Sequence, residues 1–309
     1  MGDLITMDNL SNKEIEYLLD NAERLLPVAK GDVHLPLLEG KVLANMFFEN
    51  STRTRMSFET AMKRLGGSVL NFSTSGSSVA KGETLYDTMQ MVDGYADVAV
   101  IRHPRQGAAQ YSADAIEIPV LNAGDGAGNH PTQTLLDLFT IREAHGTLKG
   151  LNVVLVGDLR YGRTAHSLSH ALVRFGATLT LVSPESLMMP AEIVSDLNEH
   201  GAEVTETSDF SATITEADVI YMTRIQKERF PDEDEYAKVA GIYMLSAADL
   251  AGAKKEMNIM QPLPRVEEIH PSVDSSIHAR YFQQAFNGVV ARMALLCDCL
   301  GVKVPKKVK

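Results

Sequence analysis

Short apolar runs alternate with segments of helical spacing along most of the chain, and this alternation limits the possible folds more than any other feature. In the first half, runs typical of strands occupy residues 42–48, 68–72, 97–101 and 118–122. Between the first two of these runs, Phe58, Ala61 and Leu65 recur at the spacing of one helix face. A repeated strand and helix order predicts a parallel sheet that helices cover.

A second series of the same kind follows. Its expected strands are residues 151–156, 178–182, 218–222 and 258–260, and residues 164–175 have the spacing of a helix. The 309 residues correspond to about two domains of roughly 150 residues. We therefore predict an α/β protein of two domains, each a mainly parallel sheet flanked by helices. We expect their boundary near the helix that Pro131 begins, and a C-terminal helix over residues 275–300 that returns to the first domain.

The composition excludes several classes of protein. Hydrophobic residues make up 45% of the chain and charged residues 22%, which rules out disorder as a description of the whole. The net charge of -11 argues against a broad basic face for nucleic acid. The sequence has no signal-like start and no run of roughly 18 apolar residues. These features favour a soluble, cytoplasmic protein that binds neither nucleic acid nor membrane.

The clearest functional signal is the run from Glu49 to Arg55, which lies between an expected strand and a helix. After a parallel strand, the start of a helix offers free backbone N–H groups and the positive end of the helix dipole. Hydroxyl groups add donors, and the guanidinium of Arg53 suits phosphate oxygens. The run predicts an anion site. The alternative is that Ser51 or Thr52 only caps the helix while both arginines face solvent.

The segment from Gly157 to Thr164 differs by one residue from a Walker A phosphate loop. Arg163 stands where that motif has lysine, and an arginine cannot act as the compact point charge of such a site. Asp218 precedes its strand, so it does not supply the magnesium-binding aspartate of such proteins. Nucleotide hydrolysis is therefore the weaker hypothesis. The alternative is that Gly157 and Gly162 only provide a tight turn, while Arg163 points at a different anion.

Further polar groups follow other expected strands. Arg102 and Arg224 each come after an apolar run, at the edge where open α/β sheets bind ligands. His130 and Gln133 are three residues apart on one helical turn and could present a ring nitrogen and an amide to one small ligand. The alternative for His130 is a cap or a surface group. Arginines at several strand ends of an acidic protein suggest a ligand with several negative groups.

The motifs of covalent catalysis and of metal binding are absent from the sequence. It contains neither Gly-x-Ser-x-Gly nor His-Glu-x-x-His. The two cysteines, Cys297 and Cys299, lie two residues apart in an apolar helical segment, where buried thiols are inert and cannot easily bridge. We therefore expect chemistry without a covalent intermediate, without a cofactor and without a metal ion.

The chain closely resembles the catalytic chains of the aspartate carbamoyltransferase family. The matching segments include residues 51–55, 77–83, 102–104, 130–133, 162–164, 222–226 and 262–265. Relatives often have His where this chain has Gln261, a difference expected to change little because the backbone carbonyls that follow are the expected contacts. The ornithine carbamoyltransferases typically carry a Trp-containing loop, and this chain has no Trp. The resemblance therefore favours aspartate over ornithine.

The resemblance implies transfer of the carbamoyl group of carbamoyl phosphate to the amine of L-aspartate, the committed step of de novo pyrimidine biosynthesis. It implies a carbamoyl phosphate-binding domain over residues 1–132 with the C-terminal helix, about 286–309, and an aspartate-binding domain over 133–285. It also implies a homotrimer with shared active sites, and family members often bind a zinc-containing regulatory chain. The alternatives are transfer to another amine such as ornithine, or a non-catalytic protein that binds an anionic metabolite.

The resemblance also implies roles for individual residues. The carbamoyl phosphate-binding residues would be Ser51, Thr52, Arg53, Thr54, Ser77, Arg102, His130, Gln133, Leu263 and Pro264. The aspartate-binding residues would be Lys81, Arg163, Arg224 and Gln226. The catalytic residues among all of these would be Arg53, Thr54, Lys81, Arg102 and His130, with Ser77 and Lys81 supplied by a neighbouring subunit.

Overall fold

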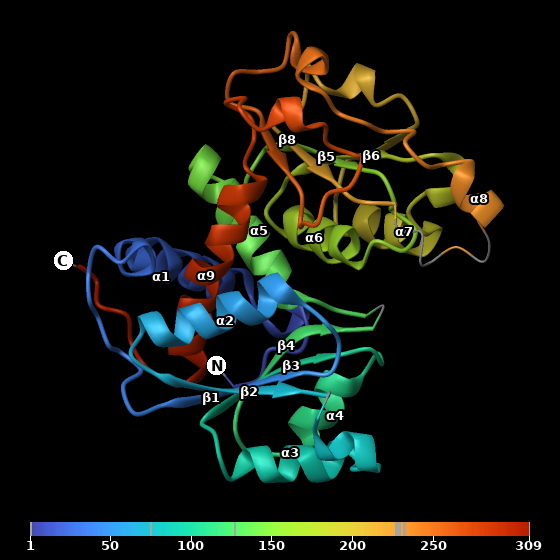
Figure 1. Ribbon diagram of the computed structural model, residues 1–309. Helices are drawn as coiled ribbons and strands as arrows, with labels where there is room; N and C mark the ends of the chain where they lie inside the picture. The colour runs from blue at the N-terminus through green and yellow to red at the C-terminus, as the bar shows by residue number, and fades with distance from the viewer. Residues whose placement is uncertain (1, 75, 127, 226–229, 231–232, 309) are drawn as a thin grey trace. The chain divides into compact units, whose positions relative to one another are not determined.

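The chain leaves its first unit inside one long helix and returns to it inside another. The first unit contains Met1–Phe139 and Phe286–Lys309, and the second contains Thr140–Ala285. Helices α5 (Pro131–His145) and α9 (Tyr281–Cys299) each cross from one unit to the other (Figure 1). The computed structural model describes residues 2–74, 76–126, 128–225, 230 and 233–308.

The first unit is built on a four-stranded parallel sheet with the strand order β2-β1-β3-β4. Helices α1 and α2 cover one face of this sheet, and α3 and α4 cover the other (Figure 1). The expected alternation of strands and helices is confirmed. Its elements before α5 are η1 (Met7–Asn9), α1 (Asn12–Lys30), β1 (Val42–Phe47), α2 (Thr52–Arg64), β2 (Ser68–Ser73), η2 (Ser78–Lys81), α3 (Leu85–Asp93), β3 (Val98–His103), α4 (Ala108–Ala115) and β4 (Val120–Asp125).

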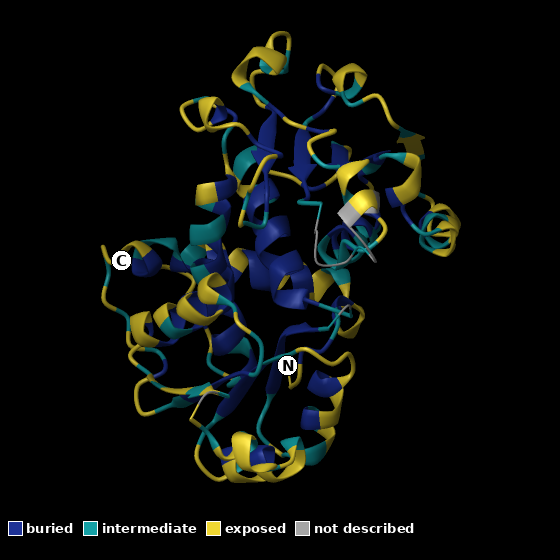
Figure 2. Cartoon of the chain, turned by 45° about the vertical axis from the view of Figure 1, so that its right-hand side comes forward, coloured by how far each residue is buried: buried dark blue, intermediate teal, exposed yellow. Residues whose placement is uncertain are grey.

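Local chemistry sets the ends of these elements. The α1 helix starts at a capping box in which the Ser11 hydroxyl accepts from the Glu14 N–H at 3.3 Å, while the Glu14 carboxylate accepts from the Ser11 N–H at 2.7 Å. It ends at Gly31, whose φ of 88° is left-handed. Strands β3 and β4 are mostly buried because helices cover both faces of the sheet, whereas the edge strand β2 is exposed or half-buried throughout (Figure 2).

The second unit is built on a five-stranded parallel sheet with the order β7-β6-β5-β8-β9. The edge strand β7 is missing from the sequence prediction because its residues, Val-Thr-Glu-Thr, include no apolar run. Helices α6 and α7 pack against one another. Its elements between α5 and α9 are β5 (Asn152–Val156), α6 (Arg163–Arg174), β6 (Thr178–Val182), η3 (Glu185–Leu187), α7 (Ala191–Glu199), β7 (Val204–Thr207), η4 (Ser211–Thr213), β8 (Val219–Met222), α8 (Glu233–Ala237), η6 (Ala247–Leu250), β9 (Asn258–Met260) and η7 (Pro271–Val273).

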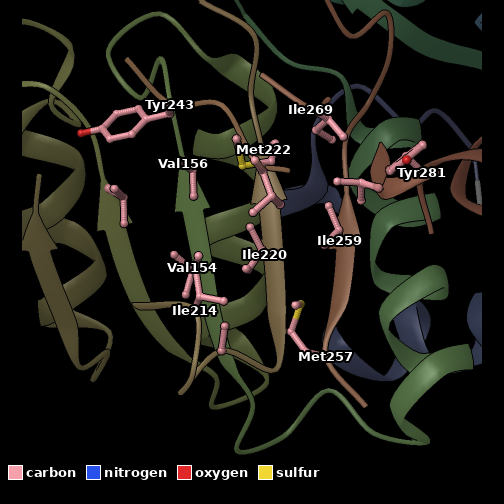
Figure 3. Packing of buried hydrophobic residues seen from close by; sticks show 14 residues of the cluster. Val154, Val156, Ile214, Ile220, Met222, Tyr243, Met257, Ile259, Ile269 and Tyr281 are labelled. Atoms are coloured by element: carbon pink, nitrogen blue, oxygen red, sulfur yellow. The ribbon is translucent and has the colours of Figure 1, made fainter. Parts of the chain in front are cut away.

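A hydrophobic cluster on one side of this sheet packs against β5, β8 and β9. Figure 3 shows Val154 and Val156 of β5 beside Ile220 and Met222 of β8, with Ile259 of β9 next to them. All five side chains have an exposed fraction of 0%. Burial of such side chains contributes roughly 1.5 to 3 kcal/mol each, so this cluster is a main source of stability for the second unit.

Helix α9 begins later than the sequence predicts. The expected start lies at residue 275, but the helix starts at Tyr281. The preceding backbone pairs with β9 instead, since the Ile259 N–H donates to the His278 carbonyl at 2.8 Å and the Arg280 N–H donates to the Ile259 carbonyl at 2.9 Å. Residues 274–278 form turns, and these two hydrogen bonds keep the backbone around Ala279 out of the helix.

The two cysteines lie near the end of α9 and are both free and buried, as expected. Burial raises the pKa of the Cys297 thiol to about 12 and raises the pKa of Cys299 as well. Neither thiol therefore forms a reactive thiolate at neutral pH. Among the described residues, no helix is both long and apolar enough to cross a membrane.

Candidate active site

Residues 51–55 lie at the carboxyl end of β1, where the backbone turns into α2. Ser51 is the N-cap residue, but its side chain makes no capping hydrogen bond. Thr54 is buried at 7% exposure, whereas Thr52, Arg53 and Arg55 are exposed. The Ser51 hydroxyl therefore does not cap the helix, although both arginines are exposed as the capping alternative expects. An anion site at the start of α2 stays a prediction.

Arg102 lies in β3, the strand beside β1, and is largely enclosed. The exposed fraction of its side chain is 14%, and its Nη2 forms an ion pair with the Glu49 carboxylate at 2.9 Å. Its Nη1 donates to the Ala123 carbonyl at 3.2 Å. The Glu49 and Ala123 contacts orient the guanidinium from two sides. The strand continues one residue beyond Arg102, to His103.

Arg53 and Arg102 lie close enough for their charges to interact. Although the residue is exposed as a whole, partial enclosure of its guanidinium lowers the pKa of Arg53, and the charge of Arg102 lowers it further. Burial also lowers the pKa of Arg102, although Glu49 opposes this shift. The Nε of Arg102 is buried and has no hydrogen-bond partner within the described part of the chain. Two neighbouring guanidinium groups, one with an unused buried donor, make a site that an oxyanion would stabilise.

The predicted His130 lies directly before α5, and the predicted Gln133 lies in its first turn. Both are buried, at 5% and 9% exposure, so the surface alternative for His130 is wrong. The His130 Nδ1 lies 3.4 Å from the Thr132 hydroxyl. The Gln133 Nε2 donates to the Asp137 carboxylate at 3.0 Å. The protein itself therefore orients the Gln133 amide.

Ser77 and Lys81 lie on the segment that follows the edge strand β2. Ser77 precedes η2 and donates its hydroxyl hydrogen to the Thr74 carbonyl at 3.0 Å. Lys81 ends η2 and is exposed. Within the described residues, neither side chain forms a hydrogen bond or ion pair with Arg53 or Arg102. The single chain thus does not link these two residues to the arginine pair.

The turn between β5 and α6 contains the segment that resembles a Walker A loop. A Cβ at Gly157 would lie 2.3 Å from the Thr223 carbonyl oxygen, and one at Gly162 would lie 2.3 Å from the Asp158 carbonyl oxygen. Both glycines therefore allow close backbone approach, as the tight-turn interpretation expects. Arg163 is the first residue of α6 and is half-buried.

Arg224 follows β8 and lines a pocket of the second unit. Gly157, Tyr243, Glu267 and Glu268 are among the other residues that line it. A guanidinium and carboxylates in one pocket suit a ligand that carries charges of both signs, such as an amino acid. The predicted Gln226, only two residues further on, lies outside the described residues.

Leu263 and Pro264 form a turn that the buried Gln261 side chain holds. Leu263 has a φ of 55°, and its peptide bond to Pro264 is cis. The Gln261 Oε1 accepts from the Leu263 N–H, and the Gln261 Nε2 donates to the Pro264 carbonyl at 3.2 Å and to Glu268. Gln261 therefore contributes more to this turn than the sequence suggests. A ligand at the Pro264 carbonyl would share that oxygen with Gln261.

Sequence reasoning missed Arg292, an arginine buried in α9 at 3% exposure. The available signal was a single charge within the otherwise apolar residues 288–297. It also gave no role to Asp137, which contacts Gln133. Among the residues that the structure describes, no group of three His, Cys, Asp or Glu side chains could hold a metal ion.

Both units place arginines at or just beyond the carboxyl ends of a parallel sheet, where open α/β proteins commonly bind ligands. The carbamoyl-P binding domain of the aspartate/ornithine carbamoyltransferases matches residues 2–143. Their Asp/Orn binding domain matches residues 149–299. The chain belongs to the aspartate/ornithine carbamoyltransferase family.

Individual relatives resemble the chain over nearly its full length. The aspartate carbamoyltransferase catalytic subunit of Archaeoglobus fulgidus is 55% identical over 301 residues, which cover 97% of this chain and 99% of the relative. The catalytic subunit of M. jannaschii aspartate transcarbamoylase has a TM-score of 0.92 at 46% identity, covering 97% of this chain and 98% of the other. The Trypanosoma cruzi enzyme in complex with carbamoyl phosphate and aspartate has a TM-score of 0.91 at 39% identity, covering 97% and 96%.

Proposed function

We infer that the chain is an enzyme that transfers the carbamoyl group of carbamoyl phosphate to L-aspartate, yielding N-carbamoyl-L-aspartate and phosphate in pyrimidine biosynthesis. The single observation that carries this proposal is the pair of neighbouring guanidinium groups, Arg53 in the first turn of α2 and Arg102 near the end of β3. Full-length similarity to aspartate carbamoyltransferase catalytic subunits supports the same function.

The first unit binds carbamoyl phosphate in this proposal. Ser51, Thr52, Arg53, Thr54 and Arg102 hold the phosphate group. An arginine pair, hydroxyl groups and the start of α2 together supply the donors that phosphate oxygens require. The Arg102–Glu49 ion pair supports this role because it fixes the direction of the Arg102 guanidinium before the ligand binds.

The carbonyl group of the same ligand is polarised by Thr54, Arg102 and His130. Charge develops on the carbonyl oxygen as the amine attacks, and donors that are already in place stabilise it at little cost. Gln133 and the backbone carbonyls of Leu263 and Pro264 hold the carbamoyl amide. The buried Gln133–Asp137 hydrogen bond supports this assignment since it holds the Gln133 amide in one orientation.

The second unit binds L-aspartate. Arg163, Arg224 and Gln226 grip its two carboxylates, and Lys81 completes the set. The neutral amine of aspartate attacks the carbonyl carbon, a C–N bond forms, and the bond between carbon and the phosphate oxygen breaks. The departing phosphate accepts the amine proton, so the step needs no cofactor or metal ion.

The proposed assembly is a homotrimer in which Ser77 and Lys81 of one subunit complete the site of the next. The exposure of Lys81 and its position after the edge strand β2 support a role outside its own subunit. The name of the A. fulgidus relative, a catalytic subunit, supports a separate regulatory chain as a further partner.

A colorimetric assay for the ureido product tests the reaction. The purified chain is incubated with carbamoyl phosphate and either L-aspartate or L-ornithine. We expect product with aspartate and none with ornithine. Product with ornithine alone would instead identify the sister activity, and binding of carbamoyl phosphate without product would identify a metabolite-binding protein.

Complementation between inactive variants tests the shared site. Arg53→Ala and Lys81→Ala chains are denatured together and reassembled, with wild-type chains treated identically as the control. If neighbouring subunits share a site, some mixed trimers hold one intact site, and activity returns. Mixed chains that stay inactive while the wild type recovers would exclude the shared site.

A further inference from the structure

A guanidinium group is buried in the first unit, within the apolar helix that returns from the second. Arg292 lies in α9 at 3% exposure, among apolar side chains such as Met293 and Leu296. Its guanidinium carbon lies 4.9 Å from the centre of the Phe58 ring. A charge in such a place is costly unless hydrogen bonds and an opposite charge compensate it.

The Arg292 guanidinium reaches two helices that the chain forms much earlier. Its Nη1 donates to the Ser57 hydroxyl in α2 at 2.7 Å. Its Nη2 donates to the Thr132 hydroxyl in α5 at 3.4 Å. The planar fork of an arginine can serve both helices at once, whereas the single ammonium of a lysine cannot cover both directions equally.

Each of these contacts continues to a residue that the proposed function places at carbamoyl phosphate. The Ser57 hydroxyl donates to the Thr54 carbonyl at 2.9 Å. The Thr132 hydroxyl lies 3.4 Å from the His130 Nδ1. One buried side chain is therefore connected to the first turn of α2 and to the first turn of α5.

The negative charge that compensates Arg292 leads to the same site. Burial lowers the pKa of Arg292 to about 9, while the charge of Asp137 opposes this shift. At neutral pH the guanidinium is therefore still charged. Asp137 also accepts the hydrogen bond from the Gln133 amide at 3.0 Å. Arg292 and the Gln133 amide therefore both interact with the Asp137 carboxylate.

We propose that Arg292 is a positioning residue, which fixes the first turns of α2 and α5 so that Thr54, His130 and Gln133 meet carbamoyl phosphate in the reactive geometry. This proposal rests on the proposed function. It gives the return of α9 to the first unit a role in catalysis, because the helix carries the group that ties the two turns together.

Gly288, one helical turn before Arg292, provides the space that the guanidinium occupies. A Cβ at Gly288 would lie 2.5 Å from the Arg292 Nη1. Gly288→Ala therefore displaces the guanidinium while the charge stays in the chain. In a helix this substitution otherwise favours folding, since alanine has a higher helix propensity than glycine.

The test compares Arg292→Lys and Gly288→Ala with Leu296→Ala, a matched control that creates a cavity in the same buried helix without altering the hydrogen bonds of Arg292. Steady-state kinetics give kcat and the KM for aspartate, and thermal unfolding followed by circular dichroism gives the melting temperature. All assays run well below the lowest melting temperature. If Arg292→Lys does not fold, Gly288→Ala carries the test.

We expect kcat to fall by about 10–100-fold in both test variants, because misplacement by about 1 Å costs that order of rate. The KM for aspartate should change less than about threefold, since its proposed ligands Arg163 and Arg224 lie in the second unit. Leu296→Ala should lower the melting temperature but keep kcat within about twofold. A kcat in the test variants equal to that of Leu296→Ala would overturn the positioning role. A wild-type chain without turnover would overturn the proposed function, and this inference with it.

Discussion

In both units an aspartate joins two strands at the amino end of the sheet, whereas the arginines at the carboxyl ends are held in different ways. Asp97 precedes β3 and accepts from the Val42 N–H at the start of β1 and from Lys41, both at 2.8 Å. Asp218 precedes β8 and accepts from the Asn152 N–H at the start of β5 at 2.8 Å. Lys254 donates to Asp218 at 2.9 Å. The repeated arrangement indicates a structural role for this edge.

The carboxyl ends differ in the way each arginine is held. In the first unit Arg102 is enclosed and paired with Glu49, so its position is set before a ligand arrives. In the second unit Arg224 is half-buried and lines a pocket together with Glu267 and Glu268. Under the proposed function, the fixed Arg102 would stabilise charge in the reaction, and the Arg224 pocket would recognise aspartate. The proposed function makes this difference testable.

The largest expected effect is in the first unit. Arg53→Ala should lower kcat by at least about 10²–10³-fold, because it removes a charged donor from the phosphate group, which gains negative charge as it leaves. Steady-state kinetics with aspartate and carbamoyl phosphate measure the effect, and circular dichroism checks the fold. Arg55→Ala, which removes an exposed arginine from the same run, is the matched control. A near-normal kcat for Arg53→Ala would end the assignment of this site.

A smaller and different effect is expected in the second unit. Arg224→Ala should raise the KM for aspartate by roughly 10–100-fold, which corresponds to the 1.5–3 kcal/mol of a charge-assisted hydrogen bond. The dissociation constant for carbamoyl phosphate, from isothermal titration, should hardly change. Arg160→Ala, at a nearby exposed arginine, provides the control. Equal losses of affinity for both ligands would contradict the division of roles between the units.

Gln261 tests how the turn at Leu263 is shaped. Gln261→Ala removes both hydrogen bonds that hold the turn and should lower kcat/KM for carbamoyl phosphate by about tenfold, which is about 1.4 kcal/mol. Gln261→His keeps a side chain that can form hydrogen bonds and should lose less. Initial rates at low carbamoyl phosphate measure both variants. Identical losses of kcat/KM for Ala and His would show that the hydrogen bonds of residue 261 do not support the turn at Leu263.

The smallest effects concern the amino ends of the sheets. Asp97→Asn and Asp218→Asn should each lower the free energy of unfolding by about 1 kcal/mol, and by similar amounts, with kcat unchanged. Urea unfolding at 25 °C measures both. A clear loss of kcat in either variant would show that this edge also serves the reaction.

The pH dependence of these two variants follows from the pKa of each carboxyl. Burial raises the pKa of Asp97 and Asp218, but hydrogen bonds from Lys41 and Val42, or from Lys254 and Asn152, outweigh it and bring each pKa below the ordinary value of 3.8. A lowered pKa stabilises the folded state above the unfolded pKa, and this contribution disappears as the pH falls through the folded pKa. The difference between wild type and either Asn variant should therefore be full at pH 7 and shrink below about pH 4.

The sequence predicted most of the architecture because buried parallel strands read as apolar runs. Strands β5, β6, β8 and β9 were found within a residue of their observed bounds. The polar edge strand β7 and the late start of α9 escaped prediction since both depend on hydrogen bonds to distant strands. Local patterns contain no information on such pairing.

The candidate site was predictable only where short motifs mark it. Arg53, Arg102 and His130 follow apolar runs in recognisable segments, so sequence reasoning could select them. The link from Arg292 to Ser57 joins residues far apart in the chain, and only the folded structure shows it. The structure also shows that Gln261 holds the turn at Leu263, a role that its position in the sequence does not indicate.

The discontinuous make-up of the first unit affects the order in which a ribosome can complete the fold. Residues 140–285 are contiguous, so the second unit can form as soon as they leave the exit tunnel. The first unit must wait for Phe286–Lys309, which is synthesised last. Nascent chains that stop before this segment would have a complete second unit and an unfinished first one. Arg292 belongs to that last segment, so such chains would also lack the link between α2 and α5.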